Sequence, residues 1–473
     1  MIEEKTTALL GPKARPFLIA AAIFSALALA FLARLAQADV LKIALIHGAC
    51  VCVMFMIVAC KNYLSKIEIL IFCFLGVQFL ASAPRPEALN PFVASHYFFS
   101  YRYGVSSRSL AATILDFFTG GGFVSATLLW HFITGATALL AFAISSFIAA
   151  AMRGVSGEAK IFAVFIIFLW LSSFVAPAFY FTVANFGRVE IFALIALFAV
   201  AVVADRPRLK WLVPILALVV LATHLILVFF LMPFIGIVLL YWALKEKPGS
   251  VESRRAWILL TVTVALALAA FALYLLFAKG TLVFENPEIF YAHLIERTNA
   301  YDEMGAFKNG LHFIMFASLE DHLEGWRMIV ELLFPGHQIV LICLPLVALF
   351  VTFWIKCFFR EREKRMRFFF LVPILALPYN AIAFFLFFDF GRWVTMSLAV
   401  QFMLVLFLMW RRNETVLEIA LSGARLVRQH VFLAALICIL MAFLGPVLDT
   451  RASENARNIF SIIRVLTGFI TGL

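Results

Sequence analysis

The stretch WLVPILALVVLATHLILVFFLMPFIGIVLLYWAL, residues 211–244, contains no Asp, Glu, Lys or Arg and has basic residues on both sides. A membrane-spanning helix needs about 20 apolar residues, so this run is too long for one span and short for two. Basic residues gather on the inner side of a membrane. Here they stand at Arg206, Arg208 and Lys210 before the run and at Lys245 and Lys247 after it. The pattern therefore predicts that the chain turns back near Thr223-His224.

Two interpretations of this run remain open. In the first, two short helices form a hairpin. Irregular backbone at membrane depth is tolerated only where it is buried in protein or lines a wet cavity, so His224 would lie near the floor of a cavity open to the outside. In the second, the run is a single long tilted helix. That helix would place one basic flank outside and break the charge pattern.

The apolar composition extends over the whole chain, which is 64% hydrophobic and 14% charged with a mean hydropathy of +1.03. A soluble protein carries about 25% charged residues. We therefore expect an all-α polytopic integral membrane protein of about 12–13 transmembrane helices, forming a single domain over residues 1–473. Apolar runs predict spans at 16–36, 40–60, 67–83, 123–151, 161–181, 190–204, 211–223, 225–244, 256–278, 338–355, 368–388, 394–410 and 431–448.

The net charge of +11 reflects membrane topology. With the N-terminus in the cytoplasm, Lys and Arg concentrate in inner segments, above all in 245–255 and 360–367, as the positive-inside rule describes. A nucleic-acid partner is therefore not indicated. None of the seven cysteines falls in a predicted outer loop, so no disulfide framework is expected.

Two long segments are expected on the outer side: the first long loop, residues 84–122, and the second long loop, residues 279–337. In the first, Leu110, Ile114, Phe117 and Phe118 can share one face of an amphipathic helix that lies in the interface. In the second, apolar residues recur every three or four positions over 309–334, which predicts a helix that could close over a cleft or only pack.

Arginines expected at the outer face oppose the charge bias and mark the candidate binding site. One short phrase occurs twice, as Asn185-Phe186-Gly187-Arg188 and Asp389-Phe390-Gly391-Arg392, each where a predicted helix meets the outer face. Arg102 and Arg108 lie in the first long loop. Guanidinium groups offer bidentate donors that match phosphate or carboxylate, so these four arginines are candidates for binding an anionic substrate. Alternatively, each one snorkels to the interface or pairs with a neighbouring acid.

Carboxylates at the same level are the candidate bases. Asp389 follows an apolar run in which desolvation would raise its pKa and Arg392 would lower it, and Glu190 is the second choice. His224 could be a base or a hydrogen-bond donor. Each carboxylate could equally be only a salt-bridge partner, and a lone membrane histidine is more often a packing residue.

These motifs together resemble bacterial polytopic membrane proteins of surface-polysaccharide synthesis, namely GT-C-class glycosyltransferases and O-antigen-type polymerases. The residues that carry the resemblance are Ser107-Arg108-Ser109-Leu110, Gly187-Arg188-Val189-Glu190, His224 and Asp389-Phe390-Gly391-Arg392-Trp393. The resemblance implies a glycosyltransferase or polymerase of the bacterial inner membrane that uses polyprenyl-(pyro)phosphate-linked saccharide at the periplasmic face, with Trp393 among the substrate-binding residues. The chain departs from the GT-C pattern because its first long loop follows the third span and lacks a paired acidic motif.

The partners implied are a lipid-linked saccharide, membrane lipid and other polysaccharide-export proteins. No cofactor is expected; a divalent metal is possible, but the sequence contains no HExxH or CxxC metal motif. A carrier or flippase for an anionic lipid-linked glycan is the alternative, since the same arginines could bind without making bonds. A non-catalytic scaffold of an export complex is the third reading.

Overall fold

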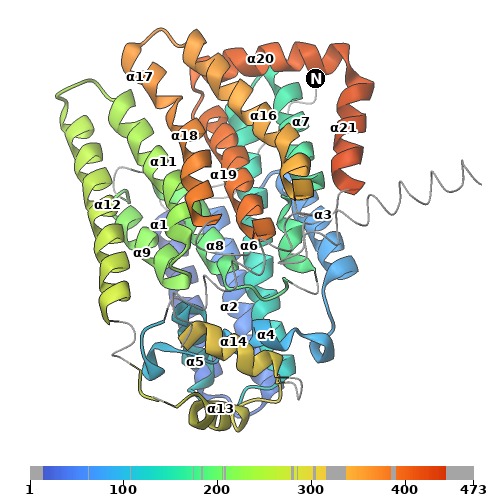
Figure 1. Ribbon diagram of the computed structural model, residues 1–473, viewed down its shortest axis with the longest axis vertical. Coiled ribbons are helices and arrows are strands. Elements are labelled where there is room, and N and C mark those ends of the chain that lie inside the picture. Colours follow the sequence, from blue (N-terminus) through green and yellow to red (C-terminus); the bar gives the residue numbers. More distant parts are fainter. Residues whose placement is uncertain are drawn as a thin grey trace, which may run out of the picture. The chain divides into compact units, whose positions relative to one another are not determined.

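The computed structural model describes residues 14–61, 63–106, 108–173, 175–182, 185–204, 206, 209–277, 282–284, 286–301, 305–315, 337–384 and 390–443. These residues form helices joined by turns (Figure 1), and an isolated parallel bridge pairs Val124 with Thr298. The chain divides into two compact units, which are described separately. Unit 1 comprises 1–149, 180–225 and 265–317, and unit 2 comprises 150–179, 226–264 and 318–473. The prediction of one domain stays a prediction.

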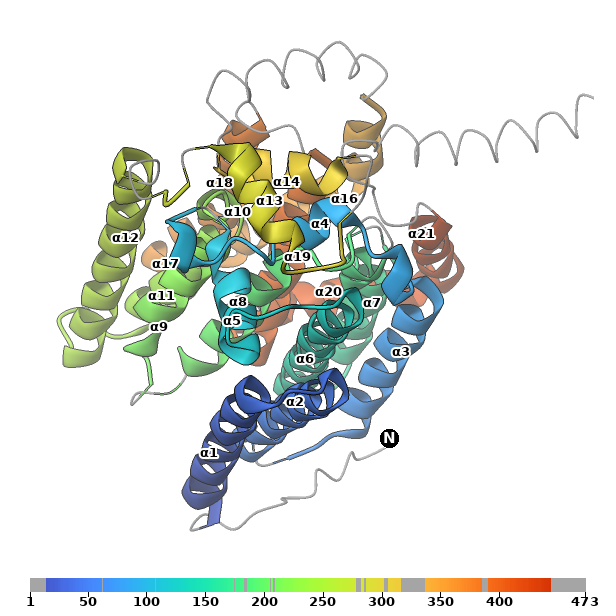
Figure 2. The same cartoon turned by 90° about the horizontal axis from the view of Figure 1, so that it is seen from below.

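Unit 1 contains most of the chain's first half. Its helices are α1 (Ala14–Leu35), α2 (Asp39–Lys61), α3 (Lys66–Ser82), η1 (Pro86–Ala88), α4 (Pro91–Ser95), η2 (Tyr101–Tyr103), α5 (Ser109–Thr119), α8 (Glu190–Val203), α9 (Leu212–Thr223), α13 (Pro287–Ile295) and α14 (Ala306–Met315). Helices α6 (Ala126–Gly154), η3 (Pro177–Phe181) and α12 (Val251–Phe277) contribute residues to both units. Helices α1 and α2 lie side by side (Figure 2).

Unit 2 contains α7 (Ala159–Ser172), α10 (Leu227–Phe230), α11 (Met232–Lys245), α16 (His337–Arg360), α17 (Lys364–Phe369), α18 (Val372–Phe384), α19 (Phe390–Trp410), α20 (Glu414–Gln429) and α21 (Val431–Phe443). Helix α20 is not among the sequence-based predictions. Asn413 caps it by accepting a hydrogen bond from the Val416 N–H, and Thr415, Val416, Ala420 and Ala424 form its buried face. A cap residue followed by apolar residues one turn apart is the signal that would have revealed it.

The predicted class is confirmed: the protein is all-α and polytopic. Within the described residues, seven helices are long and apolar enough to cross a membrane, or eight if α20 and α21, which meet at 96°, form one broken span. Four shorter apolar helices, α5, α7, α8 and α9, accompany them. Each predicted span contains an α-helix within the described residues, although α7, α8 and α9, with 14, 14 and 12 residues, are shorter than a bilayer requires.

One predicted helix boundary is wrong, and one of the two open interpretations of residues 211–244 is excluded. The span at 161–181 ends as an α-helix at Ser172, because Ser173 is extended and Pro177 then begins a short 3-10 helix. The competing single helix over 211–244 is also wrong, because α9 ends at Thr223 and His224 is extended, with φ −164° and ψ 118°. Helix α9 belongs to unit 1 and α11 to unit 2, so the hairpin stays a prediction.

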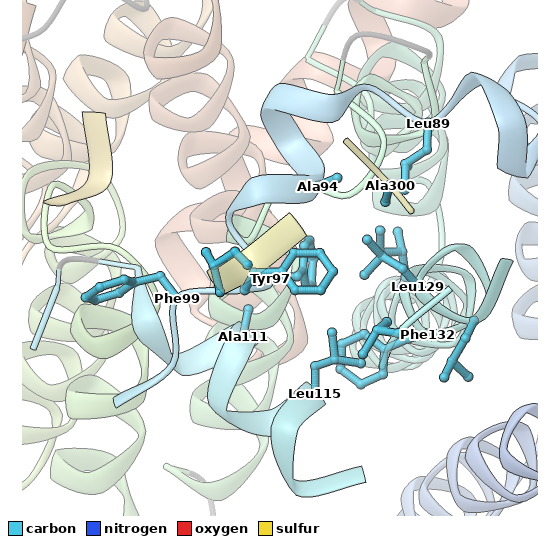
Figure 3. Close-up of a cluster of buried hydrophobic side chains, with 14 of the residues drawn as sticks. Leu89, Ala94, Tyr97, Phe99, Ala111, Leu115, Leu129, Phe132 and Ala300 are labelled. Carbon is cyan, nitrogen blue, oxygen red and sulfur yellow. The ribbon is translucent and has the colours of Figure 1, made fainter. Parts of the chain in front are cut away.

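The first long loop folds into the core of unit 1. Figure 3 shows Tyr97 and Phe99 of this loop with Leu115 of α5 and with Leu129 and Phe132 of α6 in one buried cluster. Helix α5 forms as predicted, but its buried face consists of small residues and Leu115, and Phe117 of the predicted apolar face is exposed.

The second long loop packs against the first. A backbone hydrogen bond joins Val283 N–H to the Tyr103 carbonyl at 3.0 Å, and Val124, just after the first loop, donates to the Arg297 carbonyl at 2.8 Å. A Cβ on Gly310 of α14 would come within 2.8 Å of the Phe92 carbonyl, so glycine allows α14 to lie directly on α4. Residues 316–336, most of the predicted 309–334 helix, lie outside the described residues, and closure over a cleft stays a prediction.

Candidate functional site

Arg108 is positioned by a short serine-rich turn before α5. The Ser106 and Ser109 hydroxyls lie 2.9 Å apart, and the Arg108 N–H donates to the Ser106 hydroxyl at 3.3 Å. Arg108 itself is the N-cap residue of α5, with φ −139° and ψ 13°. These hydrogen bonds fix the backbone of Arg108 and therefore the position from which its side chain extends.

The Arg108 guanidinium contacts two histidines of unit 1. Its Nε donates to His224 Nε2 at 3.1 Å, and its Nη1 lies 2.8 Å from His96 Nε2. An arginine can only donate, so both Nε2 atoms are acceptors and the neutral rings carry their protons on Nδ1. His96 and His224 are 1% and 5% exposed, so the accepting rings of both contacts are buried while Arg108 is part-buried.

The third link is a hydrogen bond between His224 and Glu190. His224 Nδ1 lies 3.1 Å from Glu190 Oε1, and since Nδ1 carries the proton, it donates to the carboxylate. Glu190 is 1% exposed and is the first residue of α8, where the helix dipole favours its negative charge. Arg108, His224 and Glu190, three residues predicted from separate sequence segments, therefore form one hydrogen-bonded chain, the Arg–His–Glu relay.

The first Phe-Gly-Arg phrase makes the turn that places Glu190. Phe186 is fully buried in the core cluster. Gly187 has a φ of +93°, a backbone conformation that residues other than glycine rarely adopt. A Cβ on Gly187 would lie 2.9 Å from Ile133 Cδ1 and 3.1 Å from Val93 Cγ1. Glycine is required here by both conformation and space, and α8 begins three residues later.

Gly187→Ala is therefore expected to lower the melting temperature more than Gly305→Ala does. Both glycines have positive φ, but nothing lies within 4 Å of a Cβ on Gly305, so the control carries only the conformational cost, about 1–2 kcal/mol. The measurement is thermal unfolding of the purified full-length protein. Equal shifts for the two variants would show that the contact with Val93 and Ile133 is unimportant.

Arg188 lies beside the relay through aromatic contacts. It is 2% exposed, and its Cζ lies 5.8 Å from the centroid of the Phe92 ring. The Phe92 ring in turn meets the His96 ring edge-on at 5.3 Å. Arg188 and the Arg108–His96 contact thus share one aromatic residue of α4, and a common binding role stays a prediction.

Arg102 lies beside a different cluster, which we call the loop clasp: Tyr103, Asp116, His293 and Arg297. Arg297 pairs with Asp116 at 2.9 Å and donates to the Tyr103 hydroxyl at 2.5 Å, and this hydroxyl lies 3.1 Å from His293 Nε2. The Ser100 hydroxyl donates to the second Asp116 oxygen. The exposed Arg102 has its Cζ 5.1 Å from the Tyr103 ring centroid. Its substrate-binding role stays a prediction.

The second Phe-Gly-Arg phrase belongs to unit 2 and differs in local structure. Phe390 begins α19, so Gly391 and Arg392 lie in its first turn, whereas Gly187 lies in a turn before α8. The Arg392 Cζ lies 4.2 Å from the Trp393 ring centroid, and Trp393 stacks on Phe230 at 4.9 Å. Arg392 and Trp393 are 2% and 1% exposed, and their binding roles stay predictions. Asp389 lies outside the described residues.

Sequence reasoning missed His96, Tyr97 and Arg297 as members of polar clusters. The motif His96-Tyr97-Phe98-Phe99 looks like an aromatic interface belt, and only the tertiary contact of His96 with Arg108 distinguishes it. Tyr97 is fully buried, and burial together with the negative charge of Glu190 raises its pKa well above the ordinary value for tyrosine. The phenol therefore stays protonated and can donate a hydrogen bond.

The relay combines an anion-binding group with a proton acceptor. Arginine can bind phosphate, and a histidine backed by a carboxylate can take a proton and hold the resulting charge. Within the part of the chain that the structure describes, no three His, Cys, Asp or Glu residues are grouped as metal ligands would be. Scans against protein-family models, curated proteins and solved structures find no match to this chain.

Proposed function

We propose that the protein is an inner-membrane glycosyltransferase or polymerase that acts on polyprenyl-(pyro)phosphate-linked saccharide at the periplasmic face. The observation that carries the proposal is the Arg108–His224–Glu190 relay, in which a part-buried arginine meets a buried histidine and a buried carboxylate. Transfer of a sugar from a phosphate ester to a hydroxyl needs two things, stabilisation of the departing phosphate and removal of the hydroxyl proton. The relay supplies a group for each within one hydrogen-bonded chain.

In this mechanism the arginines stabilise the leaving phosphate. The bond between the anomeric carbon and the phosphate oxygen breaks, and the phosphate takes the electron pair. Arg108 and the neighbouring Arg188 would stabilise the added negative charge, because guanidinium groups keep their charge at every accessible pH. Arg392, predicted for the same task, is carried by unit 2.

In this mechanism His224, supported by Glu190, removes the proton of the acceptor hydroxyl. His224 Nε2 accepts a hydrogen bond from Arg108 Nε, so Arg108 must turn toward the phosphate before Nε2 can accept the proton of the acceptor hydroxyl. As the new bond to the anomeric carbon forms, His224 becomes an imidazolium. Glu190, which accepts from Nδ1, stabilises that charge and holds the ring in place. Asp389 remains the alternative base.

The alternative is a carrier or flippase for an anionic lipid-linked glycan. A carrier would use the arginines to bind the anion, but it would not require the His224–Glu190 contact. The buried carboxylate paired with a histidine therefore favours transfer chemistry over transport.

Deletion of the gene from its native cell is expected to leave single saccharide repeat units on the lipid carrier at the periplasmic side. The measurement is the length distribution of surface polysaccharide and of lipid-linked saccharide, with the wild-type chain restored as control. Accumulation on the cytoplasmic side would instead indicate a flippase. Polysaccharide of normal length would contradict both assignments.

A further inference from the structure

A turn of three glycines after α5 lies against the end of α1 in unit 1. The first two, Gly120 and Gly121, have positive φ values of +67° and +73°, which glycine adopts without strain. A Cβ on Gly120 would lie 3.8 Å from Arg34 Cγ and 3.8 Å from the Arg34 carbonyl oxygen. Arg34 is in the last turn of α1, so the glycine turn packs directly on this helix end.

Two further arginines meet at the same turn. A Cβ on Gly121 would clash with Arg102 Nη1, and it would lie 3.6 Å from Arg102 Cζ and 3.9 Å from Arg297 Nη2. The Tyr103 ring centroid is 5.1 Å from Arg102 Cζ and 5.8 Å from Arg297 Cζ. The two guanidinium groups therefore lie side by side, and glycine at 121 leaves room for them. We call Arg34, Arg102 and Arg297 the arginine turn.

The arginine turn carries more positive than negative charge. Among the described residues, Arg297 pairs with Asp116 at 2.9 Å, whereas Arg34 and Arg102 are exposed and have no acidic partner. The Asp39 carboxylate, at the start of α2, accepts a hydrogen bond from a serine hydroxyl. Adjacent cations repel each other, so a bound anion would stabilise this arrangement.

Arg34 indicates the depth of the arginine turn in the membrane. Residues Pro16–Leu35 of α1 form a candidate span, and only 17% of its apolar window is buried inside the protein, so most of this helix would face lipid. The last turn of a span lies where the chain leaves the hydrocarbon core, at the level of the lipid headgroups. Phe117 and Phe123, before and after the glycines, are 43% and 52% exposed and offer apolar surface for acyl chains.

We propose that the arginine turn binds the phosphate of an anionic phospholipid, whose acyl chains lie along α1 and against Phe117 and Phe123. Guanidinium groups match phosphate oxygens in bidentate geometry. A soluble anion would use the charges but not the exposed aromatic rings, so a lipid fits the site better. The inference does not rest on the proposed function, and it assigns Arg102 a membrane lipid in place of the saccharide phosphate.

Gly121→Ala tests the site, with Gly120→Ala as the matched control. The two glycines have similar positive φ, so both variants carry similar backbone strain. Only the methyl group at 121 would displace the Arg102 guanidinium, because a Cβ at 120 makes ordinary contacts. The full-length protein is placed in phosphatidylcholine vesicles that contain phosphatidylglycerol with a photoreactive acyl chain. The measurement is the mole fraction of this lipid that gives half-maximal cross-linking at 117–123.

Gly121→Ala is expected to raise this mole fraction about 5-fold, which corresponds to the contribution of one basic residue near a membrane surface. Gly120→Ala should behave as the wild type. Arg102→Gln leaves the backbone unchanged and should show the same loss as Gly121→Ala, so a folding defect of the glycine variants cannot imitate the result.

Several outcomes would overturn the lipid assignment. Equal cross-linking in the wild type, Gly121→Ala and Arg102→Gln would show that the arginine turn does not bind the lipid. Equal cross-linking by photoreactive phosphatidylcholine would show that the site does not select an anionic headgroup. Displacement by millimolar inorganic phosphate or glucuronate would make it a site for soluble anions. Displacement by extracted lipid-linked saccharide would return Arg102 to the substrate. None of these measurements depends on transferase activity.

Discussion

Glu190→Gln is expected to slow polymer formation by at least about 100-fold while leaving the protein folded, because general acid–base groups contribute about 10²- to 10⁴-fold. Glutamine has nearly the same size, and its carbonyl oxygen can still accept the hydrogen bond from His224 Nδ1. The change removes the negative charge that would stabilise an imidazolium. Initial rates with extracted lipid-linked saccharide, normalised to the amount of protein in the membrane, measure the effect.

The matched control is Glu288→Gln, a glutamate of the same unit at the start of α13. Its side chain is 65% exposed and pairs with Lys308 at 2.6 Å. Exposed ion pairs contribute about 0–1 kcal/mol, so this variant should keep its activity and its melting temperature. A Glu190→Gln protein that retains half of the wild-type rate would contradict the role of the relay.

The double variant Glu190→Gln/His224→Gln refines this test. Residues that act as one unit show strongly non-additive effects on rate. If His224 accepts the proton and Glu190 supports it, the double variant should be little slower than His224→Gln alone. If the fold-losses in rate of the two single variants multiply in the double variant, the two side chains act independently. Asp389 would then be the remaining candidate base.

Asp116→Asn is expected to destabilise unit 1 by about 3–5 kcal/mol, because it leaves the guanidinium of Arg297 buried without its carboxylate. The Asp116 and Arg297 side chains are only 15% and 9% exposed, so water can replace the lost partner only in part. The loop clasp also joins the two long loops, and its loss should increase hydrogen exchange at 97–119 and 286–301 together. Thermal unfolding and hydrogen exchange of the purified protein measure the effect.

A double variant that removes both charges distinguishes the cost of burying an unpaired charge from the cost of lost packing. Replacing both partners of a buried ion pair by apolar residues is often neutral, whereas removing one is strongly destabilising. Asp116→Leu/Arg297→Met should therefore be more stable than Asp116→Asn alone. A double variant that is less stable than Asp116→Asn would show that the clasp holds the loops by its specific hydrogen bonds, including the one to Tyr103.

The helical class could be predicted from the sequence, because apolar runs of membrane length are a local property. Boundaries were less accurate where polar or special residues interrupt a run: α7 ends at Ser172, before Pro177. The amphipathic helix α20 was missed because its mean composition is polar, and only the spacing of its buried residues marks it. The two Phe-Gly-Arg phrases look equivalent in sequence, yet Gly187 needs a positive φ and Gly391 lies within the first turn of α19.

The sequence by itself determined the membrane-protein class and most of the helical segments, and it singled out Arg108, Arg188, Glu190 and His224 as polar residues in an apolar chain. Only the tertiary structure decided which of them meet. Arg108 and His224 are 116 residues apart in the sequence, and Arg297 and Asp116 are 181 residues apart. The spacing of apolar residues along the chain does not predict such contacts. The physical reason is that hydropathy and helix formation depend on neighbours along the chain. Burial of charge in this core instead required long-range partners that only packing could bring into contact.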